Sequence, residues 1–204
     1  MTQGDHSPIL QTSRWVTRFA HLVPRQGQSG GTVLDVACGS GRNARYFLRH
    51  GHAIVALDRD VAAVADLGAT CGCEVFEADL EGPNGFPLAG RRFAGVVVTN
   101  YLHRPLLPAL IEAVEPGGAL IYETFAQGNE RFRHPRNPDF LLRPGELLEA
   151  VRGRLAVVAF EQGFVAEPRP AVVQRICARN PVGPGQADPL GVQSLYPPRE
   201  PPDL

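Results

Sequence analysis

The sequence predicts an α/β fold in which a mostly parallel sheet is covered by helices on both faces. Three observations support this prediction: apolar segments alternate with helical ones, the apolar segments are continuous, and a glycine-rich turn joins the first of them to a helix. Continuous apolar strands are typical of parallel sheets, because both faces of such a sheet are buried. The alternation therefore indicates a doubly wound architecture.

The predicted elements follow one another in order along the chain. A first helix is expected over residues 8–23, where Trp15, Phe19 and Leu22 share one face. Strands are expected at residues 32–36, 52–57, 73–77, 93–99, 119–125, 155–162 and 172–178. Further helices are expected at residues 41–50, 61–67, 106–114 and from residue 143 onward. Pro144 suits the first turn of the last helix, because its missing N–H has no helical partner there.

Three connections are informative. The run Glu-Pro-Gly-Gly at residues 115–118 is predicted to end a helix and turn the chain into the fifth strand. Residues 126–142 form a long loop rich in Arg, Asn and Pro, and loops of this length are usually functional or disordered. Residues 163–170 leave no room for a crossover helix, so the last two strands must pair as an antiparallel hairpin.

Length and composition set the general class. The 204 residues, of which 44% are hydrophobic, fit one domain over residues 1–180, followed by a Pro/Gly-rich extended tail over residues 181–204. No apolar stretch is long enough to cross a membrane, and the first residues lack a signal-peptide layout. The four cysteines show no disulfide spacing. We therefore expect a cytoplasmic protein with free thiols that binds no membrane.

The charged residues exclude several mechanisms. A formal net charge of -1 gives no general basic surface, so we expect no nucleic-acid partner. All 20 basic side chains are arginines. The absence of lysine excludes Schiff-base and pyridoxal chemistry and the phosphate-binding lysine of a P-loop.

The glycine-rich turn predicts a ligand site. Residues 33–41 read Val-Leu-Asp-Val-Ala-Cys-Gly-Ser-Gly, and a helix begins near Arg42. Glycines let a ligand approach the backbone, and the helix start presents N–H groups to an anion. Asp35 adds a carboxylate beside that site. A ligand with both a cationic amine and a carboxylate fits this combination, and S-adenosylmethionine is such a ligand.

The order of elements resembles that of the class I S-adenosylmethionine-dependent methyltransferases over residues 10–180. The matching features are Asp-x-x-x-Gly-x-Gly at residues 35–41, Pro-Gly-Gly at 116–118 and the terminal hairpin. Residues 34–44, 122–130 and 140–147 also look like small bacterial methyltransferases grouped with tellurite-resistance proteins. The resemblance implies a Rossmann-like, seven-stranded, mostly parallel sheet with a C-terminal antiparallel hairpin. It also implies an enzyme that uses S-adenosyl-L-methionine and releases S-adenosyl-L-homocysteine.

The residues that the resemblance assigns to the cofactor all lie at the carboxyl ends of predicted strands, at the edge where open sheets bind ligands. They are Asp35, Ala37, Gly39 and Gly41 for the methionine part, Asp58 for the ribose, Asp79 and Leu80 for the adenine, and Asn100 beside the sulfonium. Arg59 is also assigned to cofactor binding.

Two residues are candidates for catalysis. Tyr101 also falls beside the sulfonium, and His103 stands where a general base could reach an oxygen or nitrogen acceptor. A thiolate acceptor needs no base. His103 could equally cap the following turn, and Tyr122 and Glu123 are weaker candidates for orienting the acceptor.

The acceptor is open at this stage. Arg131, Arg133, Arg136 and Arg143 concentrate positive charge in and after the long loop, where they could bind an anionic small-molecule substrate or simply be solvated. Residues 100–103 lack the paired prolines of the Asn-Pro-Pro-Tyr motif of methyltransferases that modify exocyclic amines. The sequence does not indicate an oligomeric state.

Alternative interpretations are a nicotinamide-dependent oxidoreductase and a non-catalytic nucleotide-binding relative. Residues 39–44 also fit the dinucleotide fingerprint, and Asp58 suits either ligand. Asp35, Asp79 and the terminal hairpin favour the methyltransferase. Cys71, Cys73, His50 and His52 lack the spacing of a metal site, and we expect none.

Overall fold

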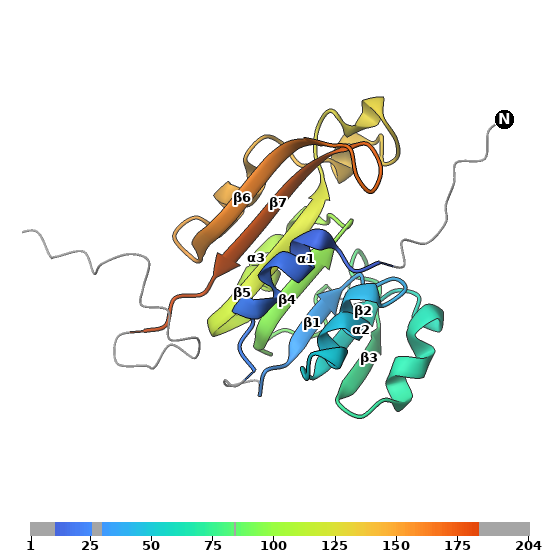
Figure 1. Ribbon diagram of the computed structural model, residues 1–204, viewed down its shortest axis with the longest axis vertical. Coiled ribbons are helices and arrows are strands. Elements are labelled where there is room, and N and C mark those ends of the chain that lie inside the picture. The colour runs from blue at the N-terminus through green and yellow to red at the C-terminus, as the bar shows by residue number, and fades with distance from the viewer. Residues whose placement is uncertain (1–10, 26–29, 84, 184–204) are drawn as a thin grey trace, which may run out of the picture.

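The protein is described by a computed structural model covering residues 11–25, 30–83 and 85–183. Seven strands form one sheet in the order β3-β2-β1-β4-β5-β7-β6 (Figure 1). They are β1 (Val33–Val36), β2 (Ile54–Asp58), β3 (Cys73–Glu77), β4 (Phe93–Thr99), β5 (Val114–Phe125), β6 (Ala156–Val165) and β7 (Ala171–Arg179). Strands β1 to β5 pair in parallel, whereas β7 runs antiparallel to both β5 and β6. The predicted Rossmann-like sheet and hairpin are confirmed.

Helices cover both faces of the sheet. One face carries α1 (Arg14–Phe19), η1 (Ala20–Leu22), α2 (Arg42–Arg49) and the 3-10 segment η2 (Ala62–Ala69); the opposite face carries η3 (Arg104–Leu106), α3 (Leu107–Glu112) and α4 (Glu146–Val151). Two short turns, η4 (Asn129–Arg131) and η5 (Pro138–Phe140), lie in the loop after β5. Each face has its own buried cluster, which includes Phe47 on the first face and Tyr122 on the second.

The first helix is shorter than predicted. Ser13 caps it by accepting hydrogen bonds from the backbone N–H groups of Trp15 and Val16, so the helix begins at Arg14. Residues 8–10 of the predicted helix lie outside the described part of the chain. The indole N–H of Trp15 donates to the carbonyl of Ile176 at 3.1 Å, which fastens this helix to β7. Leu22 is only half-buried and belongs to the 3-10 turn.

Two boundaries differ from the prediction for a backbone reason. Residues 115–118 are part of β5 rather than a turn before it, because the pairing with β4 shifts register between Phe93 and Gly95 and absorbs the extra residues. Pro144 is not in the first turn of α4. Gly145 adopts a left-handed conformation with φ of 70°, and the helix begins after it at Glu146.

The predicted boundary between domain and tail falls one residue after β7 ends at Arg179. Residues 184–204, most of the predicted tail, lie outside the described residues. Within the described segments, no helix combines the length and apolar character needed to cross a membrane.

Gly118 should be essential for the register of β4 and β5. A Cβ at this position would lie 2.8 Å from the carbonyl oxygen of Ala94 and 2.9 Å from that of Glu115. Backbone atoms cannot rotate away, so we expect Gly118→Ala to lower the free energy of unfolding by about 1–3 kcal/mol in urea denaturation. Gly68→Ala is the matched control, because its nearest neighbour would be a side-chain carbon at 3.9 Å. Equal stability of both variants would contradict this account.

Candidate functional site

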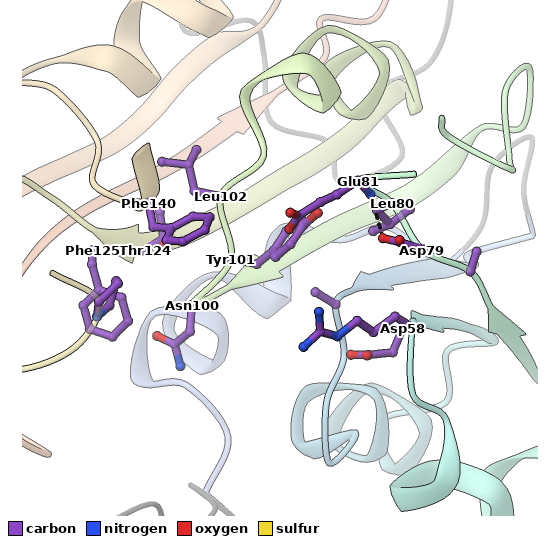
Figure 2. A pocket seen from close by; sticks show the side chains of 14 residues that line it. Asp58, Asp79, Leu80, Glu81, Asn100, Tyr101, Leu102, Thr124, Phe125 and Phe140 are labelled. Carbon is purple, nitrogen blue, oxygen red and sulfur yellow. Dashed lines mark hydrogen bonds between the residues drawn. The ribbon is translucent and has the colours of Figure 1, made fainter. Parts of the chain in front are cut away.

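A cavity of about 420 Å³ lies at the carboxyl ends of β1, β2, β3 and β4 (Figure 2). This volume is in the range of small-ligand sites. Its lining comes from the ends of four parallel strands and from the loop after β5. The lining residues are Ala37, Asp58, Arg59, Ala78, Asp79, Leu80, Glu81, Asn100, Tyr101, Leu102, Thr124, Phe125, Pro135 and Phe140.

The glycine-rich turn closes one end of this cavity. Ala37, Gly39 and Gly41 all have positive φ angles, of 50°, 53° and 69°, which bend the chain sharply between β1 and α2. Gly41 must lack a side chain, since a Cβ there would lie 2.6 Å from Cγ1 of Val64. Of these three residues only Ala37 lines the cavity. The two glycines therefore shape the turn, while Ala37 borders the cavity.

Asp35 lies beneath the turn and not in the cavity lining. Its side chain is 1% exposed, and its Oδ2 accepts a hydrogen bond from the backbone N–H of Ala44 at 2.9 Å. The other oxygen has no hydrogen-bond partner among the described residues. Burial raises the pKa of Asp35 from 3.8 to about 7, against the hydrogen bond from Ala44. This carboxylate therefore fixes the start of α2 below the site.

Asp58 is the last residue of β2, Asp79 lies two residues after the end of the neighbouring strand β3, and both line the cavity (Figure 2). Asp58 accepts hydrogen bonds from the backbone N–H of Gly39 at 2.7 Å and of Asp60 at 3.1 Å. Asp79 accepts one from the N–H of Glu81 at 3.0 Å. A carboxylate offers about four acceptor positions, so each can still accept hydrogen bonds from a ligand. Leu80, 5% exposed, adds an apolar surface beside Asp79.

Asn100 and Tyr101 follow β4 at the centre of the cavity. Asn100 has a φ of 58°, unusual for a residue other than glycine, and its N–H donates to the carbonyl of Glu123 at 2.9 Å. Burial, and then the nearby charge of Glu81, raise the pKa of the Tyr101 hydroxyl. That hydroxyl therefore stays protonated at neutral pH and is available as a hydrogen-bond donor rather than as a base.

His103 is not brought into the cavity lining with Asn100 and Tyr101. It precedes η3, and its backbone carbonyl accepts a hydrogen bond from the N–H of Leu106 at 3.0 Å. The backbone of His103 thus takes part in the local turn, whereas its side chain makes no capping hydrogen bond there. Whether the imidazole takes part in catalysis stays a prediction.

The loop over residues 126–142 forms a wall of the cavity through Pro135 and Phe140. Its inner support is Asn129, which is fully buried and donates to the carbonyls of Arg133 and Pro135, both at 3.2 Å. Asn129 also accepts a hydrogen bond from the N–H of Val172 at 3.2 Å. The Asn129 side chain therefore connects the loop to β7.

Arg104 fixes the far end of the same loop. Its guanidinium donates to the carbonyls of Asp139 at 2.6 Å and Leu141 at 2.8 Å, and it forms an ion pair with Glu146 at 2.7 Å. The Glu146 side chain is 7% exposed. Because Phe140 lies between these two carbonyls in the sequence, Arg104 holds Phe140 in its position at the cavity. No motif in the sequence indicated this residue.

A second cavity of about 560 Å³ adjoins the first and shares Asn100 and Phe125 with it. Its walls include Arg42, Glu123 and Arg175, of which the sequence indicated only Glu123, and that weakly. These residues are distant in sequence, and only the antiparallel pairing of β5 with β7 brings Glu123 opposite Arg175. The arginines predicted in the loop do not all line the same cavity.

Of those loop arginines, Arg133 lines the second cavity, and it also lines a third, more open one of about 610 Å³. Arg136 lines only the third cavity. Arg131 lines none of the three, and Arg143 pairs with Glu146 at 3.4 Å. Among the described residues, no group of three His, Cys, Asp or Glu side chains is arranged to hold a metal ion.

Comparisons with known proteins agree with this geometry. Residues 33–118 match a protein family described as a methyltransferase domain. No curated protein sequence matches the chain. An S-adenosylmethionine-dependent methyltransferase from Mesorhizobium loti is 18% identical, with a TM-score of 0.64 over 84% of this chain and 100% of that protein.

Two further solved structures share the fold. The glycopeptide N-methyltransferase MtfA, solved with S-adenosyl-L-methionine, is 20% identical with a TM-score of 0.56 over 89% of this chain and 100% of that one. TehB from Haemophilus influenzae is 18% identical with a TM-score of 0.58. The match to TehB covers 73% of this chain but only 57% of the length of TehB.

Asp35 should make the stability of the ligand-free protein depend on pH. Its folded-state pKa, about 7, lies above its ordinary value of 3.8, so the folded state binds the extra proton and its stability falls as the pH rises from about 4 through 7. At about 1.36 kcal/mol per pKa unit, this loss is at most about 4 kcal/mol. We expect urea denaturation at pH 5 and pH 8 to show a smaller difference for Asp35→Asn than for the unmodified protein. Identical differences would contradict the assignment.

Proposed function

We propose that the chain is a methyltransferase of the class I S-adenosylmethionine-dependent superfamily and that it transfers the methyl group of S-adenosyl-L-methionine to a small-molecule acceptor. The match of residues 33–118 to a methyltransferase-domain family supports this proposal. One observation carries the proposal: the carboxylates after β2 and β3 line the same cavity as the bend at Ala37 and as Asn100. That spacing of groups suits an adenosine at one end and an amino-acid group at the other. The MtfA neighbour is known with S-adenosyl-L-methionine, S-adenosyl-L-homocysteine and sinefungin.

Each group of the cofactor has a partner of suitable chemistry in this proposal. Asp58 accepts hydrogen bonds from the two ribose hydroxyls, with Arg59 beside it, and Asp79 accepts one from the adenine amino group while Leu80 contacts the ring. The turn around Ala37 receives the methionine part, with Gly39 and Gly41 shaping the turn and Asp35 supporting it from below. Asn100 lies beside the sulfonium.

The chemical step needs alignment more than activation. A sulfonium is already a good leaving group, so the protein must hold the acceptor atom, the methyl carbon and the sulfur in one line and exclude water. Phe125 and Phe140 contribute apolar surface around this point, together with Leu102. Tyr101 is proposed to orient the acceptor by donating a hydrogen bond, consistent with its raised pKa.

A nicotinamide-dependent oxidoreductase is less well supported. The sheet order ends in β5-β7-β6 with an antiparallel β7, whereas a dinucleotide-binding fold continues with a second parallel half. We also propose that the protein acts in the cytoplasm, since its four cysteines are free thiols, as is usual in a reducing compartment.

Binding of S-adenosyl-L-homocysteine tests the cofactor site. We expect isothermal titration calorimetry to detect binding by the unmodified protein and a roughly 10- to 100-fold weaker affinity for Asp58→Ala, because hydrogen bonds to a charged acceptor are lost. Asp60→Ala is the control, since Asp60 is a nearby exposed carboxylate that does not line the cavity. Tighter binding of NADH than of S-adenosyl-L-homocysteine would refute the proposal.

The role of His103 needs a separate test. If the acceptor atom is oxygen or nitrogen, His103→Ala should lower kcat by about 10²- to 10⁴-fold, the usual contribution of a general base, and leave the affinity for S-adenosyl-L-homocysteine unchanged. His21→Ala, at an exposed histidine of η1, is the control. Full turnover by His103→Ala with such an acceptor would remove His103 from the mechanism.

A further inference from the structure

The second cavity adjoins the place where the cofactor's methyl group is proposed to lie. Its 560 Å³ are bounded by residues 11–14 before and at the start of α1, by residues 165–169 at the end of β6 and in the following turn, by the carboxyl end of β5 and by the first half of β7. Asn100 and Phe125 belong to both cavities. A molecule in the second cavity would therefore meet the cofactor at Asn100.

Positive charge exceeds negative charge around this cavity. Five arginines and two glutamates line it: Arg14, Arg42, Arg133, Arg169, Arg175, Glu123 and Glu167. Both carboxylates are already paired, Glu167 with Arg14 at 3.0 Å and Glu123 with Arg175 at 2.6 Å. An incoming cation would thus find no unpaired carboxylate on these walls.

Two of the arginines differ from the paired ones. Arg42 donates only to neutral oxygens, the carbonyl of Gln11 at 2.9 Å and the hydroxyl of Thr99 at 3.2 Å. Arg42 and Arg133 are both half-buried, and neither forms an ion pair with a described carboxylate. Partial removal of a guanidinium from water is unfavourable unless an anion compensates it. Burial lowers the pKa of Arg42, against the opposing effect of the charges of Glu123 and Asp35.

Hydrogen bonds connect the residues on one side of the second cavity. The Glu123 carboxylate accepts a hydrogen bond from the Ser13 hydroxyl at 2.6 Å, and its backbone carbonyl holds Asn100. Ser13 in turn caps α1, so the N-terminal helix, β5 and the junction between the cavities form one hydrogen-bonded unit. Such a unit can fix one end of an acceptor relative to the cofactor.

Resting on the proposed function, we propose that the second cavity is the acceptor site and that it binds the acceptor through an anionic group, a carboxylate or a phosphate, held between Arg42 and Arg133. The atom that receives the methyl group then lies at Asn100. In the transfer, the bond from sulfur to the methyl carbon breaks with its electron pair left on sulfur, and a lone pair of the acceptor atom forms the new bond. A hydroxyl acceptor also releases its proton to a base or to solvent.

Calorimetry on the protein saturated with S-adenosyl-L-homocysteine tests this assignment. The probes are benzoate and inorganic phosphate, with benzamide as the neutral analogue of benzoate. We expect at least one anion to bind more tightly than benzamide. Arg133→Gln should lower the affinity for that anion on the order of tenfold or more, because a charge-assisted hydrogen bond is lost. Arg131→Gln is the matched control, since Arg131 lies in the same loop but lines none of the cavities.

The outcomes separate the two proposals. If S-adenosyl-L-homocysteine does not bind, both proposals fail. If S-adenosyl-L-homocysteine binds but benzamide binds as tightly as the anions, only the proposal of an anion site fails. The same holds if Arg131→Gln lowers the affinity for the anion as much as Arg133→Gln does. Arg42→Gln is expected to lower the affinity for the anion probe and to leave the affinity for S-adenosyl-L-homocysteine unchanged. A loss of S-adenosyl-L-homocysteine affinity instead would place the carboxylate of the cofactor at Arg42 and overturn the assignment of that residue.

Discussion

The hydrogen bond from the backbone N–H of Ala44 to the buried carboxylate of Asp35 is the contact on which the candidate site depends. It joins the end of β1 to the first turn of α2 at 2.9 Å, in surroundings where solvent cannot replace it. With this contact in place, the residues between must bend through positive φ angles, and Gly39 then reaches Asp58 at the end of β2. One buried carboxylate thereby sets the relation of two strands, a helix and the cavity above them.

The parallel pairing of the strands brings further site residues to the same edge of the sheet. Because β1 pairs with both β2 and β4, the chain segments that follow these strands emerge at the same edge. Asp58, Asp79 and Asn100 are separated by about twenty residues each in sequence but line one cavity. The remaining wall is supplied by the loop after β5, which Asn129 and Arg104 fasten to β7 and to α4.

Charge divides the hollow region into two parts of different chemistry. The first cavity has the carboxylates of Asp58, Asp79 and Glu81, with Arg59 as its basic residue. The second has more arginines than carboxylates. The two meet at Asn100, beside a backbone held by Glu123. A cationic sulfonium at the junction and an anionic acceptor beyond it would each find complementary charge, and this is the physical basis of both proposals.

Local sequence was enough to predict the fold because each signal is short-range. Continuous apolar strands, the glycine-rich turn and the short connection of residues 163–170 dictate a parallel sheet with a terminal hairpin, and β3 and β4 have the predicted bounds. The same signals place Asp58, Asp79 and Asn100 after strands, hence in one cavity. Boundaries that depend on pairing, such as the start of β5, were missed because a bulge opposite β4 decides them.

What the sequence alone could not determine is which side chains share a space. Arg131 and Arg133 are two residues apart and chemically identical, yet only Arg133 lines the second cavity, because Asn129 fixes the course of the loop from within. Glu123 meets Arg175 only through the register of β5 and β7. Asp35 carries a raised pKa only because the fold buries it. The sequence thus determined the sheet and the residues at the carboxyl ends of its strands. Tertiary packing decided which side chains are buried and which charges pair, since both arise from contacts between segments distant along the chain.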